Sequence, residues 1–191
     1  MRTISFTNWL SGIRYLGKFQ SSVDIMNRHI INALSISRIL FGLLFLFVVV
    51  FQFNILSLMV IFALAIISDV LDGHFTRKYG LVADNGSRID VICDFSFIFF
   101  STLALCLIDL VPYWFLLVIV LKLIEFFMTS GSGDLKYDRF GTYVAYMFYA
   151  FPVIAILINS KNILLILTIS ITVCAIASSL LRIKNMRELN D

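Results

Sequence analysis

Apolar residues dominate the chain from residue 30 to the C-terminus, where long hydrophobic runs alternate with short polar breaks. Each run is close to about 20 residues, the length at which an α-helix crosses the hydrocarbon core of a bilayer. A soluble core needs no such repetition, so the pattern predicts an all-α, multi-pass integral membrane protein. The predicted transmembrane helices lie at about residues 31–52, 55–77, 86–108, 111–130, 138–159 and 162–182.

The first 29 residues follow a different pattern. Their apolar residues recur at helical spacing, and the cations Arg14 and Lys18 fall off that stripe. This pattern is typical of an amphipathic helix that lies in the membrane interface; the alternative is a poorly ordered tail. We therefore expect an interfacial segment over 1–29 and a six-helix transmembrane domain over 30–191 with a short cytoplasmic C-terminal tail.

The composition agrees with a membrane protein. The chain is 60% hydrophobic and only 14% charged, whereas soluble domains contain about 25% charged residues. The net charge of +3 is small, and no dense basic run is present to indicate nucleic-acid binding.

The positive charges predict the orientation. Twelve of the fifteen Lys and Arg residues fall on one side of the predicted spans, Lys161 falls on the other, and Arg38 and Lys122 lie within spans. Because cytoplasmic loops carry an excess of Lys and Arg, both termini and the loop between the second and third spans are expected in the cytoplasm.

That loop and its flanking helices contain five aspartates, in the stretch "SDVLDGHFTRKYGLVADNGSRIDVICD". With a rise of 1.5 Å per residue, Asp69 and Asp94 both lie roughly 13 Å from the loop. Asp72 and Asp90 both lie roughly 8 Å from it. Four carboxylates therefore form two pairs, each at one depth across the two facing helices. The fifth aspartate, Asp84, is expected to be an ordinary polar residue at a helix end.

Four carboxylates at close range in a membrane are costly unless positive charge offsets them. Arg77 supplies one charge and cannot balance four. Divalent cations can, and hard oxygen ligands suit Mg²⁺ or Mn²⁺. Two such ions would clamp a phosphoryl group for in-line displacement. The residues thus predict a two-metal site that acts on a phosphate.

The spacing resembles the signature of the CDP-alcohol phosphotransferase family, D-x2-D-G-x2-A-R-x8-G-x3-D-x3-D. The matching positions are Asp69, Asp72, Gly73, Arg77, Gly86, Asp90 and Asp94, and Thr76 stands where the family usually has Ala. The stretch "NALSISR" at Asn32–Arg38 is also similar to the family's N-x-L-T-x-x-R opening. Together with the six-span layout, the resemblance covers most of the chain.

The resemblance implies a phospholipid synthase that transfers a phosphatidyl group from a CDP-linked lipid, usually CDP-diacylglycerol, to a small polar alcohol with release of CMP. It also implies a homodimer in the cell (inner) membrane with its active site facing the cytoplasm. Asp69, Asp72, Asp90 and Asp94 would hold the metals, and Asp94 would also be the base. The residues expected to hold the nucleotide of the donor are Asn32, Ser35, Gly73, Thr76, Arg77 and Gly86.

The acceptor is less well defined by the sequence. Lys122 and Glu125, spaced i, i+3, are either an internal ion pair or part of an acceptor pocket. Lys136 and Arg139 are either membrane anchors or cations for a phosphorylated acceptor such as glycerol 3-phosphate. Inositol phosphate, serine and another phospholipid headgroup remain open as acceptors.

Three other functions compete with this hypothesis. A Mg²⁺-dependent intramembrane prenyltransferase also uses aspartates on a diphosphate, but those proteins resemble longer bundles with two separate Asp-rich loops. A transporter or proton relay would also place aspartates in the membrane. A family member without activity is the third, and the presence of all four aspartates argues against it.

Overall fold

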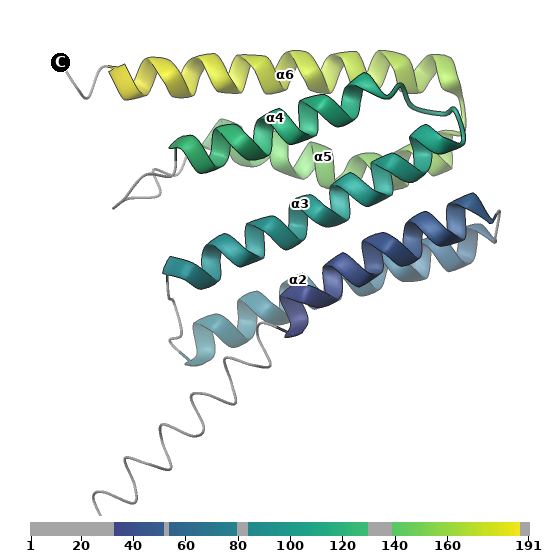
Figure 1. Cartoon of the computed structure of the whole chain (residues 1–191), viewed down its shortest axis with the longest axis horizontal. Coiled ribbons are helices and arrows are strands. Elements are labelled where there is room, and N and C mark those ends of the chain that lie inside the picture. Colours follow the sequence, from purple (N-terminus) through teal and green to yellow (C-terminus); the bar gives the residue numbers. More distant parts are fainter. Residues whose placement is uncertain (1–32, 52–53, 80–83, 130–138, 188–191) are drawn as a thin grey trace, which may run out of the picture.

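The computed structural model describes residues 33–51, 54–79, 84–129 and 139–187, which form six helices and no strand. Figure 1 shows an elongated bundle whose helices run broadly along its long axis. The helices are Ala33–Val50, α2 (Ile55–Tyr79), α3 (Asp84–Leu107), α4 (Trp114–Thr129), α5 (Arg139–Ile158) and α6 (Lys161–Arg187). The predicted all-helical fold is confirmed.

The helix bounds follow the hydrophobic runs closely. Five of the helices begin and end near the predicted limits, whereas α6 continues beyond residue 182 to Arg187. The predicted interfacial helix over residues 1–29 lies outside the described residues, so that it stays a prediction.

Four of the described helices are long and apolar enough to cross a membrane: Ala33–Val50, Ile89–Leu107, Phe140–Ile158 and Lys161–Ile183. In α2 the apolar segment among the described residues is the shorter Ile55–Leu71. Helix α4 has only 16 residues. A helical membrane protein is therefore supported, and the count of six spans remains a prediction.

The outer surface of the bundle is apolar. Leu40, Leu117 and Ile166 expose 62%, 63% and 66% of their surface, and many other large hydrophobic residues are exposed in the same way. A soluble monomer rarely presents contiguous apolar surface on this scale. These side chains are placed to face lipid.

The interior contains two apolar clusters. One lies among α3, α4, α5 and α6 and includes Phe115, Phe148 and Phe151, whose rings pack together with Phe115 and Phe151 centroids 4.9 Å apart. The other joins the Ala33–Val50 helix to α2 and α3 through Phe45 and Ala104. The bundle therefore has one half built on residues 33–107 and another built on α4–α6. Helix α3 joins the halves, because its residues take part in both clusters.

Two short turns connect helices at the end of the bundle away from the aspartates. Asp109 and Asn159 both have positive φ, 59° and 45°, the left-handed conformation that Asn and Asp tolerate best among residues with a side chain. After α3, the Leu110 N–H donates to the Leu105 carbonyl at 3.0 Å and the Asp109 N–H to the Cys106 carbonyl at 3.0 Å. These bonds satisfy carbonyls that the end of a helix leaves open.

Gly42 permits a close approach between the Ala33–Val50 helix and α3. A Cβ at Gly42 would lie 3.1 Å from the Phe97 Cα and 3.3 Å from the Phe100 Cβ. The first of these atoms is backbone, so the neighbouring helix would have to shift. Small residues let the backbones of membrane helices pack closely, and Gly42 lies one turn after Arg38 on the same face of its helix.

Replacing Gly42 by leucine should separate these two helices and lower the melting temperature of the purified protein. Forcing extra atoms into a packed interface costs about 1–3 kcal/mol, and Gly42→Ala should have a smaller effect of the same sign. Ala63→Leu is a suitable control, because Ala63 is exposed on α2. Thermal unfolding in detergent measures the effect, and equal melting temperatures for Gly42→Leu and Ala63→Leu would contradict the packing described.

Candidate functional site

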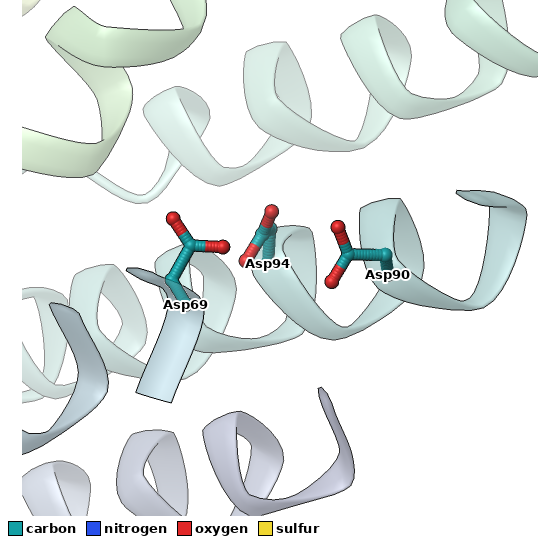
Figure 2. Close-up of side chains that lie close together, drawn as sticks. All are labelled: Asp69, Asp90 and Asp94. Carbon is teal, nitrogen blue, oxygen red and sulfur yellow. The ribbon is translucent and has the colours of Figure 1, made fainter. Parts of the chain in front are cut away.

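Three aspartates of α2 and α3 converge in the structure. Asp69 comes from α2, and Asp90 and Asp94 lie one turn apart on α3. One carboxylate oxygen from each can be chosen so that all lie within 4.8 Å of one another. Figure 2 shows the three side chains side by side, with Asp94 between Asp69 and Asp90. The predicted level pairing of Asp69 with Asp94 agrees with this arrangement.

The other predicted residues of the motif are described only in part. Asp72, Thr76 and Arg77 belong to α2, and Gly86 belongs to α3, but the positions of the three α2 side chains lie outside the description. Asn32 lies outside the described residues. The convergence of a fourth carboxylate and the contacts of Arg77 therefore stay predictions.

Arg38 lies in the middle of the acidic cluster, and sequence reasoning did not include it in the site. Its side chain is 0% exposed. Its Nη1 donates to Asp69 Oδ1 at 2.7 Å and also to Asp94 Oδ1, and its Nη2 donates to Asp90 Oδ1. A buried guanidinium stays charged and needs such partners. The protein thus supplies a counter-charge that the sequence analysis sought only in metals and in Arg77.

Hydroxyl groups fix the helix that carries Arg38 against α2. The Ser37 and Ser68 oxygens lie 2.8 Å apart, and both approach the carbonyl oxygen of Leu34, at 2.6 and 2.9 Å. Ser68 directly precedes Asp69, so this contact sets the register of Arg38 opposite the cluster. Ser35, a predicted nucleotide residue, is buried one turn before Arg38.

A cavity of about 420 Å³ opens beside the cluster. Asp69 and Asp94 line one part of it, next to apolar residues of α3, and α4, α5 and α6 supply the rest of the wall. The polar side chains on that wall are Lys122, Glu125, Thr142, Tyr146, Tyr149, Ser178 and Arg182. The cavity can hold a small molecule whose reacting group touches the aspartates.

Lys122 and Glu125 form the internal ion pair that was one of the two interpretations, and their role in an acceptor pocket stays a prediction. Lys122 Nζ lies 3.0 Å from Glu125 Oε2, so the two form an ion pair. Ser179 of α6 bridges them, because Lys122 donates to Ser179 Oγ at 2.9 Å and Ser179 donates to Glu125 Oε2 at 2.6 Å. Lys122 and Glu125 also line the cavity.

The cation that sequence reasoning missed on this wall is Arg182. In the sequence it is only one of the twelve cations that predict the orientation, yet it lines the cavity, and its guanidinium carbon lies 5.8 Å from the centre of the Phe126 ring. The continuation of α6 past residue 182 holds it there. Lys136 lies outside the described residues, and Arg139 begins α5 with its side chain outside the description.

The carboxylate oxygens of the acidic cluster fit a divalent cation. Three carboxylates with side-chain exposures of 49%, 40% and 31% offer hard oxygen ligands, and two of them, Asp69 and Asp94, line the cavity. Such a site on a lipid-facing helical bundle is typical of a membrane enzyme that handles phosphate groups. The fold and the site together are those of a helical membrane protein with a candidate divalent-cation site.

Comparison with protein families identifies the chain within that class. The CDP-alcohol phosphatidyltransferase family matches over residues 28–176, which is most of the chain. The chain therefore belongs to this family, as the aspartate motif indicated. The comparisons with individual curated proteins and with solved structures gave no match.

Membership establishes the general activity. The protein is a transferase of substituted phosphate groups that uses a CDP-alcohol in phospholipid synthesis, and it is an integral membrane protein. The family generally depends on a divalent metal. The acidic cluster is the part of the described structure with the chemistry to meet that requirement.

Proposed function

We propose that the protein transfers a phosphatidyl group from CDP-diacylglycerol, or a similar CDP-lipid, to a small anionic alcohol and releases CMP. Glycerol 3-phosphate is the acceptor that the chemistry favours. The observation that carries the proposal is a cavity shared by two aspartates of the cluster and by cations of α4 and α6. An alcohol held by the cations would place its hydroxyl beside the carboxylates.

In this reaction the acceptor hydroxyl oxygen attacks the phosphorus that bears the diacylglycerol. A new phosphorus–oxygen bond forms, the anhydride bond between the two phosphates breaks, and CMP leaves with the electron pair. Asp94 accepts the hydroxyl proton, because it lies in both the cluster and the cavity wall. Two Mg²⁺ or Mn²⁺ ions, held by Asp69, Asp72, Asp90 and Asp94, would neutralise charge on the phosphates.

The nucleotide of the donor is assigned to the cytoplasmic ends of α2, α3 and the Ala33–Val50 helix. Gly73 and Gly86 leave room for a ligand beside the backbone, and Arg77 offers a fork of donors to phosphate. Ser35 shares the Ala33–Val50 helix with Arg38, which reaches the cluster. Asn32 and Thr76 complete the proposed set from the family motif.

The charges on the cavity wall favour an acceptor that carries a negative charge. Apart from the aspartates, the described lining residues with charge are Lys122, Arg182 and Glu125. Glu125 offsets Lys122 through their ion pair, so Arg182 contributes the excess positive charge. A phosphate on the acceptor would pair with it, and Lys136 and Arg139 are proposed to assist.

Neutralising Arg182 should raise the KM for the acceptor about tenfold or more, since charge-assisted hydrogen bonds contribute about 1.5–3 kcal/mol. The KM for the CDP-lipid should change little, because Arg182 and the donor's proposed binding residues lie on different helices. Arg182→Gln tests this expectation, with Lys161→Gln as a control that removes a cation from the opposite end of α6. Steady-state kinetics with each substrate varied in turn separates the two KM values. Equal rises for donor and acceptor would contradict the assignment.

The site is proposed to face the cytoplasm of the cell membrane, in a homodimer. The distribution of Lys and Arg supports this orientation, because twelve of the fifteen fall on the side of the aspartate-bearing loop. CDP-lipids are made from cytosolic CTP, and Mg²⁺ is available on the same side.

Purified protein in liposomes with CDP-diacylglycerol, Mg²⁺ and a panel of alcohols tests the proposed function. We expect CMP release that depends on the acceptor and is greatest with glycerol 3-phosphate. Release of diphosphate from a prenyl donor would instead indicate a prenyltransferase, and ion flux without turnover would indicate a transporter. Failure to release CMP with every acceptor would refute the proposal.

A further inference from the structure

Arg38 binds the same carboxylates that are proposed to bind the metals. Its guanidinium contacts Asp69, Asp90 and Asp94, and these are the residues whose oxygens come within 4.8 Å of one another. A guanidinium and a divalent cation are both attracted to these oxygens, and they repel each other at such short range. The contribution of each cation to the site therefore depends on whether the other is present.

The side chain of Arg38 is shielded from bulk solvent. Its side chain is 0% exposed, whereas the three aspartates are partly exposed. The Ser37–Ser68 contact and the close approach at Gly42 hold its helix against α2 and α3. Arg38 can therefore change partners by rotating its side chain, but its charge stays close to the cluster.

From this geometry we propose that Arg38 is a positioning residue that competes with divalent metal for the cluster and couples metal binding to binding of the CDP-lipid. Without the donor, Arg38 weakens metal binding. When the donor's diphosphate is present, its oxygens accept the Arg38 N–H groups, and its negative charge reduces repulsion between Arg38 and the metal. Metal and donor then bind cooperatively, and the inference rests on the proposed function.

Binding free energies are reciprocal, so the coupling can be measured from the metal side. We expect Arg38→Met to bind Mn²⁺ about 5- to 150-fold more tightly than the wild type when no nucleotide is present, the range that such couplings usually span. CDP, a soluble probe that carries the nucleotide and diphosphate, should tighten Mn²⁺ binding strongly in the wild type and weakly in Arg38→Met.

Electron paramagnetic resonance measures the Mn²⁺ that stays unbound in a solution of the detergent-purified protein. It gives these affinities without a measurement of turnover. Lys161→Met is the matched control, because it removes one cation from the far end of α6, and its Mn²⁺ affinity should equal that of the wild type. Arg38→Lys keeps the charge and should also stay close to the wild type. Equal or weaker Mn²⁺ binding by Arg38→Met would overturn the inference.

Stability provides a second readout. In chelator, Arg38→Met should melt at a lower temperature than the wild type, because the carboxylates lose their internal counter-charge, and saturating Mn²⁺ should reduce the difference.

If Arg38→Met does not fold, the wild type alone decides: CDP must tighten its Mn²⁺ binding by at least about fivefold. A wild type that binds Mn²⁺ equally with and without CDP refutes this inference but leaves the proposed function standing. A wild type that binds no Mn²⁺ under either condition refutes the proposed function.

Discussion

Replacement of Asp94 by asparagine should lower the rate of CMP release by about a thousandfold or more. A positioned general base contributes about 10²–10⁴ in rate, and Asp94 is also proposed to hold metal, so that both contributions would be lost together. Asparagine has nearly the same shape but cannot accept the proton from the acceptor hydroxyl at neutral pH. The loss should appear in kcat, measured as CMP released in liposomes with saturating donor and acceptor.

The control for this variant lies at the other end of the same helix. Asp109→Asn makes the same chemical change just after α3, where the backbone has positive φ that Asn adopts readily. It should retain wild-type activity. Size-exclusion profiles and helical circular dichroism should match for both variants. An Asp94→Asn protein that is folded and within about threefold of the wild type would contradict the role of Asp94 as a base.

Removal of divalent metal should abolish turnover. The donor's diphosphate and the carboxylates of Asp69, Asp90 and Asp94 repel one another, and only added positive charge allows them to lie together. We expect chelation with EDTA to reduce CMP release to background and Mg²⁺ or Mn²⁺ to restore it. The assay is the same liposome reaction, with the metal concentration varied.

Conservative variants of the proposed ligands sharpen this test. Asp69→Asn and Asp90→Asn should each require a higher Mg²⁺ concentration for half-maximal rate, whereas Asp109→Asn should require the same concentration as the wild type. Full activity in chelator would show that the cluster has another purpose. An unchanged Mg²⁺ requirement in Asp69→Asn and Asp90→Asn would show that the metals bind elsewhere.

The sequence predicted the helices and the matching depth of Asp69 and Asp94 because both depend on local periodicity. A short loop brings the two helices together antiparallel, and the number of residues from that loop sets the depth of Asp69 and Asp94. Once the two helix faces are turned toward each other, helix geometry brings these residues to the same depth. The family motif then gave these positions their chemical meaning.

Arg38 and Arg182 could not be placed in the same way. Arg38 is separated from its partners by 31 to 56 positions along the chain, and no local pattern states which helix faces which. One signal was available: a charged residue in the middle of an apolar span needs a partner. Arg182 follows the last hydrophobic run, where membrane-anchoring cations are common, and only the continuation of α6 brings it to the cavity.

The two halves of the bundle give the enzyme a modular basis for changing substrate. The acidic cluster and Arg38 belong to residues 33–107, whereas Lys122, Glu125 and Arg182 belong to α4 and α6. Under the proposed assignment of the acceptor to the cavity, mutations in the later helices should alter which alcohol is accepted while the bond-making chemistry stays intact. On that assignment, the specificity for the headgroup could change through substitutions in α4 and α6 without any change in the acidic cluster.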